Sequence, residues 1–356
     1  MVLLLVWERE LSPVRPERSS ADSARACRRK KDRHEHPTCV ARHRAGVTEA
    51  ICCEFIFPPL LRLSRSPLPV QAVQHVKRMR GGAQSHLMRA DDGNFYVVKF
   101  QNNPQHRRVL ANDFFATRLA ERVGLPVPVV EIVEVDGWLV EHTSELTFQL
   151  SDRTVPCEPG LQFGSKYVVD PLQGQVLDYL PETMVSQIRN VETFAGILAL
   201  DKWTCNADGR QAAFWRKLRE KKYTATFIDQ GYCFNAGEWS FPDAPLRGVF
   251  LRNDVYVGIT GWESFEPWLT HLEEMPVHEI GACAEGIPEE WYEYDHDGLD
   301  MLIQELDKRR KRVRKLIDEF RRSSRMPFPN WRDEGEERVV PVMWGSARDK
   351  DPGRWN

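Results

Sequence analysis

The sequence contains no run of about 18 consecutive apolar residues, the length that a membrane-spanning helix needs. It also lacks a strong charge of either sign, because 49 Lys and Arg are balanced by 52 Asp and Glu, for a formal net charge of -3. A protein that mainly coats nucleic acid would be strongly basic. We therefore expect neither a membrane protein nor a general nucleic-acid binder.

Cysteine is also sparse, with eight residues in a chain of 356. A chain of this length can bury a core without disulfide bonds, so these cysteines do not indicate a small secreted scaffold. Residues 1–7 are apolar, but no basic segment precedes them and Glu8 follows at once, which does not match a secretory signal peptide. Together these features favour a reducing, cytoplasmic setting.

Residues 1–69 differ from the rest of the chain. They hold 13 Lys and Arg against 8 Asp and Glu, with scattered prolines and no sustained hydrophobic period. This composition predicts a disordered N-terminal extension, and it equally suits an upstream segment outside the working protein. A zinc site is the alternative, since four potential ligands lie close together, but their spacing contains no C-x2-C pair. These ligands are His34, His36, Cys39 and His43.

From Val70 onward the pattern becomes that of a folded domain. Residues 70–76, 85–90 and 95–100 alternate or carry the β-branched and aromatic residues typical of strands. A turn at Gly81 and Gly82 separates the first two strands. Residues 91–94, with the sequence Asp-Asp-Gly-Asn, form a hairpin signal between the second and the third.

The following elements are predicted from periodicity. Residues 112–123 have the spacing of an amphipathic helix, which Gly124 would end. Further strands are expected at 127–135, 138–141 and 223–229, the first two around a turn at Asp136 and Gly137. Helices are expected at 184–200 and 295–322, and the chain after residue 323 is rich in Pro, Arg and Asp and is expected to be loose.

Lys99 ends a predicted strand that follows a glycine turn and a hairpin. In many nucleotide sites, backbone amides of a glycine turn face the phosphates and a strand lysine pairs with them. Gly81, Gly82 and Lys99 are therefore candidate phosphate-binding residues. The simpler alternative is that Lys99 is a surface lysine on an edge strand.

Two acidic residues follow elements that suit phosphoryl transfer. Asp208 lies in a turn rich in Asn, Asp and Gly after an apolar helix, where an aspartate can orient an acceptor hydroxyl and accept its proton. Asp229 ends a strand, Gly231 lets the chain turn, and a carboxylate at such a place is a hard oxygen ligand for Mg²⁺. Each signal alone also fits an ordinary loop, and it is their order along the chain that favours a kinase.

Residues from about 70 to 322 resemble the HipA-like kinase family, in particular its compact bacterial branch, which lacks the classical N-terminal domain. The motifs that carry the resemblance are Tyr96-Val-Val-Lys99, Asn112-Asp113-Phe114, Arg118-Leu-Ala120, Gly124-Leu-Pro-Val-Pro128, Gly160-Leu-Gln-Phe-Gly-Ser165, Asn206-Ala-Asp208, Phe227-Ile-Asp-Gln-Gly231 and Ile287-Pro-Glu-Glu-Trp291. The resemblance implies a two-lobed α+β protein-kinase-like fold. A small antiparallel β lobe would span 70–143, a larger, mainly helical lobe 144–325, and a loose tail 326–356, with ATP bound between the lobes.

The resemblance also implies roles for individual residues. Lys99 would bind the ATP phosphates together with Gly81 and Gly82. Asp113 would be the acidic partner of Lys99. Family members usually carry glutamate at this position, so the shorter aspartate has to reach the lysine.

By the same resemblance, Asp208 would be the catalytic base and Asp229 the Mg²⁺ ligand. The family usually places a metal-binding asparagine five residues after the catalytic aspartate, and here that position is Ala213. Gln211 is the only nearby side-chain amide and is included among the cofactor-binding candidates.

The expected function is phosphoryl transfer that depends on ATP and Mg²⁺, to a protein Ser/Thr hydroxyl because the family's known type does that. The alternatives are a catalytically weak ATP-binding regulator and a small-molecule phosphotransferase. Nucleic-acid binding through the basic run at 308–315 is a third alternative, but acidic residues flank that run and an apolar stripe passes through it. A solvated helix face is therefore favoured, and neither a nucleic acid nor a membrane is expected as a partner.

Overall fold

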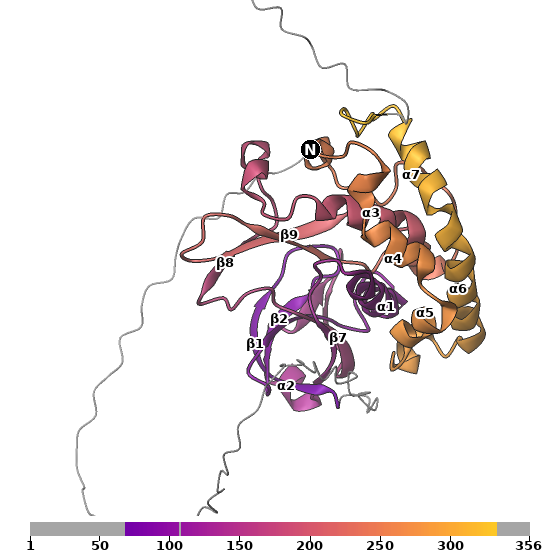
Figure 1. Ribbon diagram of the computed structural model, residues 1–356. Helices are drawn as coiled ribbons and strands as arrows, with labels where there is room; N and C mark the ends of the chain where they lie inside the picture. The colour runs from indigo at the N-terminus through magenta and orange to yellow at the C-terminus, as the bar shows by residue number, and fades with distance from the viewer. Residues whose placement is uncertain (1–67, 107, 333–356) are drawn as a thin grey trace, which may run out of the picture. The chain divides into compact units, whose positions relative to one another are not determined.

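The computed structural model describes residues 68–106 and 108–332 (Figure 1). Residues 1–67 of the extension predicted at 1–69, which include the candidate zinc ligands, lie outside these described residues. The chain mixes strands and helices, as predicted, with most strands before most helices. Within the described ranges, none of the helices has the length and hydropathy to cross a membrane.

Five strands close into a barrel in the order β1-β2-β3-β7-β4. They are β1 (Val70–Arg78), β2 (His86–Ala90), β3 (Phe95–Lys99), β7 (Gly160–Lys166) and β4 (Val130–Val135). The strands predicted at 70–76, 85–90, 95–100 and 127–135 are present. The neighbours pair antiparallel except β1 and β4, which pair parallel, so the expected antiparallel sheet is a closed barrel with one parallel pairing.

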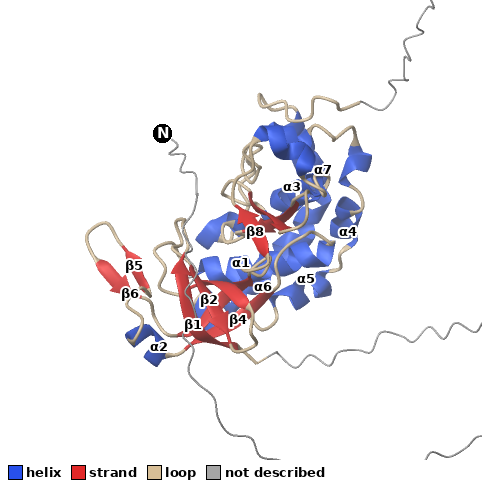
Figure 2. Cartoon of the chain, turned by 90° about the vertical axis from the view of Figure 1, so that its left-hand side faces the viewer, coloured by secondary structure: helices blue, strands red, loops and turns tan. Residues whose placement is uncertain are grey.

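The β-rich part extends further along the chain than expected. β7, which follows the lobe boundary predicted at residue 143, pairs with both β3 and β4 and therefore belongs to the barrel. Between β4 and β7 lie the short helix α2 (Gly137–Glu141) and the hairpin β5 (Thr147–Gln149) and β6 (Thr154–Pro156). This hairpin stands out from the barrel (Figure 2).

The strand expected at 138–141 is the helix α2 instead. The side chain of Asp136 accepts a hydrogen bond from the backbone N–H of Trp138 at 2.7 Å and so caps the first turn. The predicted turn at Asp136 and Gly137 is therefore a helix start. The segment is too short for its periodicity to separate a helix from a strand.

Helix α1 (Arg108–Val123) is one turn longer at its start than predicted and ends as predicted, since Gly124 has a φ of +88°. It lies between the barrel and the helices of the second half (Figure 1). Phe115, Leu119 and Val123 are buried in the core shared by these elements. The position of α1 places its middle turn next to the end of β3.

A second sheet has the order β10-β9-β8, all antiparallel. Its strands are β8 (Gly174–Leu177), β9 (Gln211–Lys217) and β10 (Thr224–Ile228), and helix α3 (Thr193–Thr204) precedes β9. The strand predicted at 223–229 is present, whereas β9 was not predicted. The helix expected at 184–200 is split into the 3-10 helix η1 (Glu182–Gln187) and α3, because Ile188 bridges to Tyr223 and Asn190 hydrogen bonds to the backbone of Ala225.

The remaining helices pack against α1 and α3. They are α4 (Trp268–Glu274), α5 (Val277–Ala284), α6 (His296–Arg309) and α7 (Val313–Arg321), with 3-10 helices η2 (Cys233–Glu238), η3 (Asn253–Tyr256), η4 (Trp262–Phe265), η5 (Glu289–Tyr292) and η6 (Arg310–Arg312). The single helix expected at 295–322 is therefore interrupted by η6. Its predicted apolar stripe is buried, including Leu302, Leu306, Val313 and Ile317.

The basic run at 308–315 is paired within the fold. Its arginines form ion pairs with acidic side chains of neighbouring elements: Arg309 and Arg312 with Asp243, Arg310 with Asp307, and Arg314 with Glu273. The run is therefore not the solvated helix face favoured from the sequence throughout, because the Arg309 side chain is only 5% exposed. The tail expected to be loose from residue 326 is packed at its start, since Phe328 is buried against Tyr256, Phe265 and Phe320.

Candidate active site

Lys99, the last residue of β3, lies between two carboxylates from distant parts of the chain. Its Nζ is 2.6 Å from Oδ2 of Asp113, on α1, and 2.7 Å from Oδ1 of Asp229, which follows β10. The side chains of Lys99 and Asp113 are 7% and 3% exposed, whereas that of Asp229 is 27% exposed. The aspartate that replaces the expected glutamate therefore reaches the lysine, and Asp229 is the member of the cluster that faces solvent.

The electrostatics of this cluster keep Lys99 and Asp229 ionised. Burial disfavours the ammonium, but the charges of Asp113 and Asp229 outweigh it and raise the pKa of Lys99. Burial also opposes the ionised form of Asp229, but Lys99, Arg210 and a hydrogen bond from Gln211 lower the pKa of this carboxyl. Burial, together with the charge of Asp229, raises the pKa of Asp113 in spite of Lys99.

The chain turns at Asp229 itself. Its φ is +61°, in the left-handed region that aspartate tolerates better than most residues. The expectation that Gly231 provides the turn is wrong, because Gly231 has no positive φ. Glycine is needed there for a different reason: a Cβ at Gly231 would overlap the side chain of Val109 on α1. Close packing of this segment against α1 brings Asp229 towards Asp113, and the backbone N–H of Gln230 donates to Asp113 at 2.9 Å.

Asp208 lies in an exposed loop after α3, as predicted. The helix ends at Cys205, whose φ is +51°. The Oδ1 of Asn206 accepts a hydrogen bond from the backbone N–H of Asp208 at 3.1 Å, and the Asp208 carboxylate accepts one from the N–H of Gly209 at 2.7 Å. The N–H of Ala207 donates to the carbonyl of Tyr232 at 2.9 Å, which ties this loop to the segment that follows Asp229.

Gln211, the first residue of β9, faces Asp229. Its Nε2 donates to Oδ2 of Asp229 at 3.0 Å. Ala213, where the family usually has its metal-binding asparagine, lies within β9 opposite Thr226 and is buried. At the start of β9, it is therefore the side-chain amide of Gln211 that reaches the carboxylates around Lys99.

The glycine turn between β1 and β2 is held by hydrogen bonds within the turn and to β5. The N–H of Gln84 donates to the carbonyl of Gly81 at 3.1 Å, and the Gln84 side chain exchanges two hydrogen bonds of 2.8 Å with the backbone of Gln149 in β5. A Cβ at Gly82 would lie 3.2 Å from Gln105. In the part of the chain that the structure describes, no hydrogen bond or ion pair joins this turn to Lys99, and a phosphate-binding role for Gly81 and Gly82 stays a prediction.

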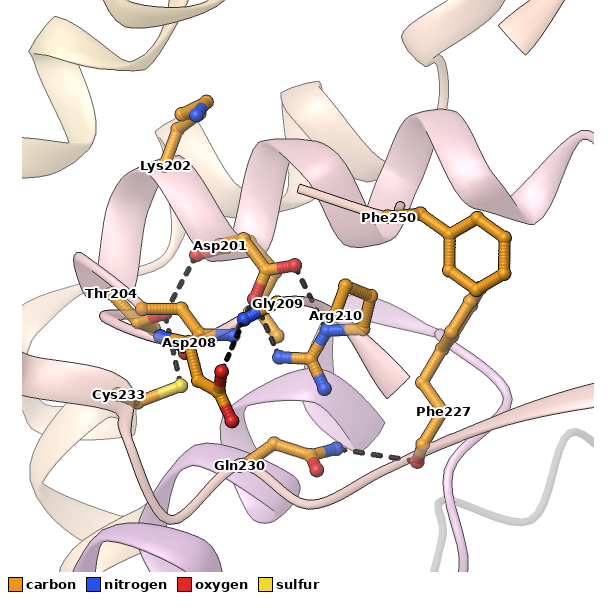
Figure 3. Close-up of polar contacts among 12 residues, drawn as sticks. Asp201, Lys202, Thr204, Asp208, Gly209, Arg210, Phe227, Gln230, Cys233 and Phe250 are labelled. Atoms are coloured by element: carbon orange, nitrogen blue, oxygen red, sulfur yellow. Dashed lines mark hydrogen bonds and ion pairs between the residues drawn. The ribbon is translucent and has the colours of Figure 1, made fainter. Parts of the chain in front are cut away.

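A buried network around Asp201 was not predicted (Figure 3). The Nε and Nη2 of Arg210 donate to the two oxygens of Asp201 at 2.9 and 2.5 Å, and Nδ2 of Asn206 donates to Oδ1 at 2.9 Å. The Nη1 of Arg210 also donates to the carbonyl of Ile228 at 2.9 Å. The only sequence signal for this network is the charged pair Asp201 and Lys202 at the end of the apolar stretch of α3.

Tyr232 is a second residue that the sequence did not single out. Partial burial and the negative charges of Asp208 and Asp229 raise the pKa of its hydroxyl.

The donor set limits how a metal ion could bind. Among the described residues, no group of three His, Cys, Asp or Glu side chains could hold a metal. Mg²⁺ is usually bound through one or two carboxylates, waters and substrate phosphates rather than by a cage made of protein alone. The partly exposed carboxylate of Asp229 fits that mode of binding.

A comparison with curated proteins finds no match. Among solved structures, the chain is similar to the Helicobacter pylori proinflammatory kinase CtkA, with 13% sequence identity, a TM-score of 0.44, and 70% of this chain and 98% of that chain covered. It is also similar to the Golgi casein kinase, with 11% identity, a TM-score of 0.42, and 72% and 74% covered. A third similar structure is HipA in a complex with HipB and operator DNA from Shewanella oneidensis MR-1, with 14% identity, a TM-score of 0.31, and 74% and 69% covered.

A family comparison gives a direct sequence match. The family of HipA-like kinases matches residues 72–221, a stretch that runs from β1 through β9. It includes Lys99, Asp113 and Asp208, and Asp229 lies just beyond its end. The resemblance to the HipA-like kinases that the motifs indicate is thereby confirmed for residues 72–221.

Proposed function

We propose that this chain is a phosphotransferase of the kinase type, with a two-lobed protein-kinase-like fold, that uses ATP and Mg²⁺. The observation that carries the proposal is the position of the Lys99 ammonium between Asp113 and Asp229. A fixed positive charge beside a solvent-facing carboxylate is what phosphate and metal binding require. The match of residues 72–221 to HipA-like kinases supports the same function.

In this proposal Asp113 holds Lys99, and Lys99 contacts phosphate oxygens of the nucleotide. The buried hydrogen bond between them fixes the ammonium, so little conformational freedom is lost when the phosphates bind. Asp229 is the residue that would hold Mg²⁺, and Gln211 fixes its second oxygen. Bound Mg²⁺ would neutralise the charge on the transferring phosphoryl group.

Asp208 is proposed to accept the proton of the acceptor hydroxyl. Its carboxylate is exposed, and its backbone is held by Asn206, so an acceptor could approach it from solvent. A protein Ser/Thr hydroxyl is the proposed acceptor, and a small-molecule hydroxyl is the alternative. A second candidate function is an ATP-binding regulator with weak transfer, favoured by the position of Ala213 inside β9, where no second metal ligand is available.

The first experiment measures thermal unfolding of the full chain with and without Mg²⁺-ATP. A ligand at 100 times its Kd stabilises the folded state by about 2.7 kcal/mol, so binding is readily visible. We expect the wild type to shift, Asp229→Ala to lose the shift, and Asp152→Ala to keep it, since Asp152 is an exposed acidic residue in the loop between β5 and β6. The absence of a shift in the wild type would exclude nucleotide binding and with it the proposal.

Transfer is then measured with labelled ATP and a generic acceptor protein rich in Ser and Thr. Asp208→Asn should lower kcat strongly and leave the nucleotide-induced thermal shift in place. Wild-type transfer rates in Asp208→Asn would show that another group accepts the proton. A wild type that binds Mg²⁺-ATP but transfers no label to protein or to itself would favour the regulator.

A further inference from the structure

We infer that Asp201, a residue that cannot touch substrate, positions both candidate catalytic carboxylates at once. This inference rests on the proposed function, in which Asp208 accepts the proton and Asp229 holds Mg²⁺. Asp201 would position both of these carboxylates. The side chain of Asp201 is 1% exposed, so any effect on phosphoryl transfer has to act through its hydrogen bonds. Figure 3 shows Asp201 on α3, above the loop that carries Asp208 and Arg210 and above the segment that carries Phe227 and Gln230.

One branch of hydrogen bonds leads from Asp201 to Asp208. Oδ1 of Asp201 accepts from Nδ2 of Asn206 at 2.9 Å, which orients the Asn206 amide. The oxygen of the same amide accepts from the backbone N–H of Asp208 at 3.1 Å. The backbone of Asp208 is therefore held relative to α3 through a single side chain that Asp201 orients.

The other branch leads from Asp201 to Asp229. Arg210 donates two hydrogen bonds to Asp201, and its Nη1 donates to the carbonyl of Ile228 at 2.9 Å. Ile228 is the last residue of β10, and Asp229 follows with its φ of +61°. The left-handed turn that aims Asp229 at Lys99 therefore begins at a carbonyl that Asp201 fixes through Arg210.

Stability alone does not account for this ion pair. The side chains of both partners are 1% exposed, and a pair of buried charges can often be replaced by apolar residues without loss of stability. The pair provides something that apolar residues cannot: directed hydrogen bonds that connect a helix, a loop and a strand end. Misplacement of a reacting group by about 1 Å can lower a rate by about 100-fold, so a shared anchor for two loops is of direct use in catalysis.

The experiment compares four variants of the full chain. Asp201→Asn keeps the shape of the side chain and removes its charge. If this variant does not fold, the double variant Asp201→Leu with Arg210→Met replaces the ion pair by apolar side chains. Asn206→Ala removes only the branch to Asp208. Asp243→Asn is the matched control, because it removes the carboxylate that pairs with Arg309, whose side chain is 5% exposed, and removes none of the hydrogen bonds of Asp201.

Two readouts are taken for each variant. In transfer assays we expect the Asp201 variants to lose about 100-fold in kcat and to keep only a reduced nucleotide-induced thermal shift, because Asp229 is displaced but not removed, and Asp243→Asn to keep the wild-type kcat and thermal shift. In amide hydrogen exchange we expect faster exchange at both Asp208 and Gln230 in the Asp201 variants. In Asn206→Ala we expect faster exchange at Asp208 alone, and in Asp243→Asn at neither.

The two readouts separate the inference from the proposed function. If the wild type neither binds nucleotide nor transfers phosphate, the proposed function fails. Exchange at the two amides then still decides whether Asp201 couples the two loops. If the Asp201 variants exchange like the control, or transfer phosphate at the wild-type kcat, Asp201 is not a positioning residue.

Discussion

The ammonium of Lys99 lies 2.7 Å from the carboxylate of Asp229, although 130 residues separate the two along the chain. The same ammonium lies 2.6 Å from Asp113, which is buried, whereas the Asp229 side chain is 27% exposed. The two carboxylates therefore differ in what they can do. Asp113 is an anchor for the lysine, and Asp229 is open to a cation from solvent.

The first prediction concerns the charge balance of this cluster. Lys99→Met leaves the Asp113 carboxylate buried without its partner, and breaking a buried pair in this way typically costs about 3–5 kcal/mol. We expect a loss of unfolding free energy of that size, measured by urea denaturation at pH 7.5. The same variant should show no thermal shift with Mg²⁺-ATP.

The double variant Lys99→Met with Asp113→Leu separates stability from function. Apolar residues of similar volume should restore most of the unfolding free energy, because no buried charge remains unpaired next to α1. Nucleotide binding should not return. If the double variant is as unstable as the single one, the loss comes from packing rather than from the charge on Asp113.

A second prediction concerns Gly231. A Cβ at this position would overlap the side chain of Val109, so Gly231→Ala should displace α1 and destabilise the fold by about 1–3 kcal/mol. Val109→Ala removes the obstacle, and the two substitutions together should therefore cost less than the sum of the single changes. Additive costs in chemical denaturation would show that these two residues do not compete for the same space.

A third prediction concerns pH. His86 is fully buried in the barrel between Phe100 and Phe148, and burial, with a contribution from His75, lowers its pKa to about 4. The unfolded chain takes up this proton near pH 6.5 and the folded chain only near pH 4. The unfolding free energy therefore falls as the pH is lowered through this window, by about 2 kcal/mol at pH 4.5.

His86→Leu should remove this part of the pH dependence. The control is Phe148→Leu, which alters the packing around the same ring without changing a titrating group. We expect denaturation curves between pH 7.5 and 4.5 to show a smaller slope for His86→Leu and the wild-type slope for Phe148→Leu. If the unfolding free energies of His86→Leu and the wild type fall equally with decreasing pH, a group other than His86 causes the loss of stability in acid.

A fourth prediction concerns Gln211. Gln211→Glu places a second carboxylate beside Asp229, which should destabilise the chain without metal through like-charge repulsion and strengthen Mg²⁺ binding in the presence of ATP. The Mg²⁺ concentration needed for half of the nucleotide-induced thermal shift should fall several-fold.

Gln173→Glu is the matched control for this change. Gln173 also donates to an aspartate, Asp170, at 2.8 Å, but on the exposed surface before β8. It should leave the Mg²⁺ requirement of the nucleotide shift unchanged. An equal effect of both substitutions would mean that any added surface charge suffices and that Gln211 does not face a metal position.

Features with a strong local signal could be predicted from the sequence. The strands at 70–76 and 95–100 and the helix that Gly124 ends follow from residue patterns of short range, and the structure contains all three. Lys99 and Asp229 were chosen by motif order, Asp113 by the resemblance to HipA-like kinases and Gln211 as the only nearby side-chain amide. The structure brings these four side chains together. Segments with a weak signal were predicted wrongly. One example is 138–141, which was predicted as a strand and is a helix because the side chain of Asp136 caps its first turn.

The sequence by itself determined the α+β mixture of strands and helices, the glycine-ended helix and the identity of the charged residues that meet at Lys99. The first two depend on short-range propensity, and the third on motif order together with the resemblance to HipA-like kinases. Only the tertiary structure decided that β7 closes the barrel, that Gly231 makes room for Val109, and that Asp201 links the loops of Asp208 and Asp229. The physical reason is that burial and hydrogen-bond partners depend on segments far apart in the chain, and no local pattern records which of them will meet.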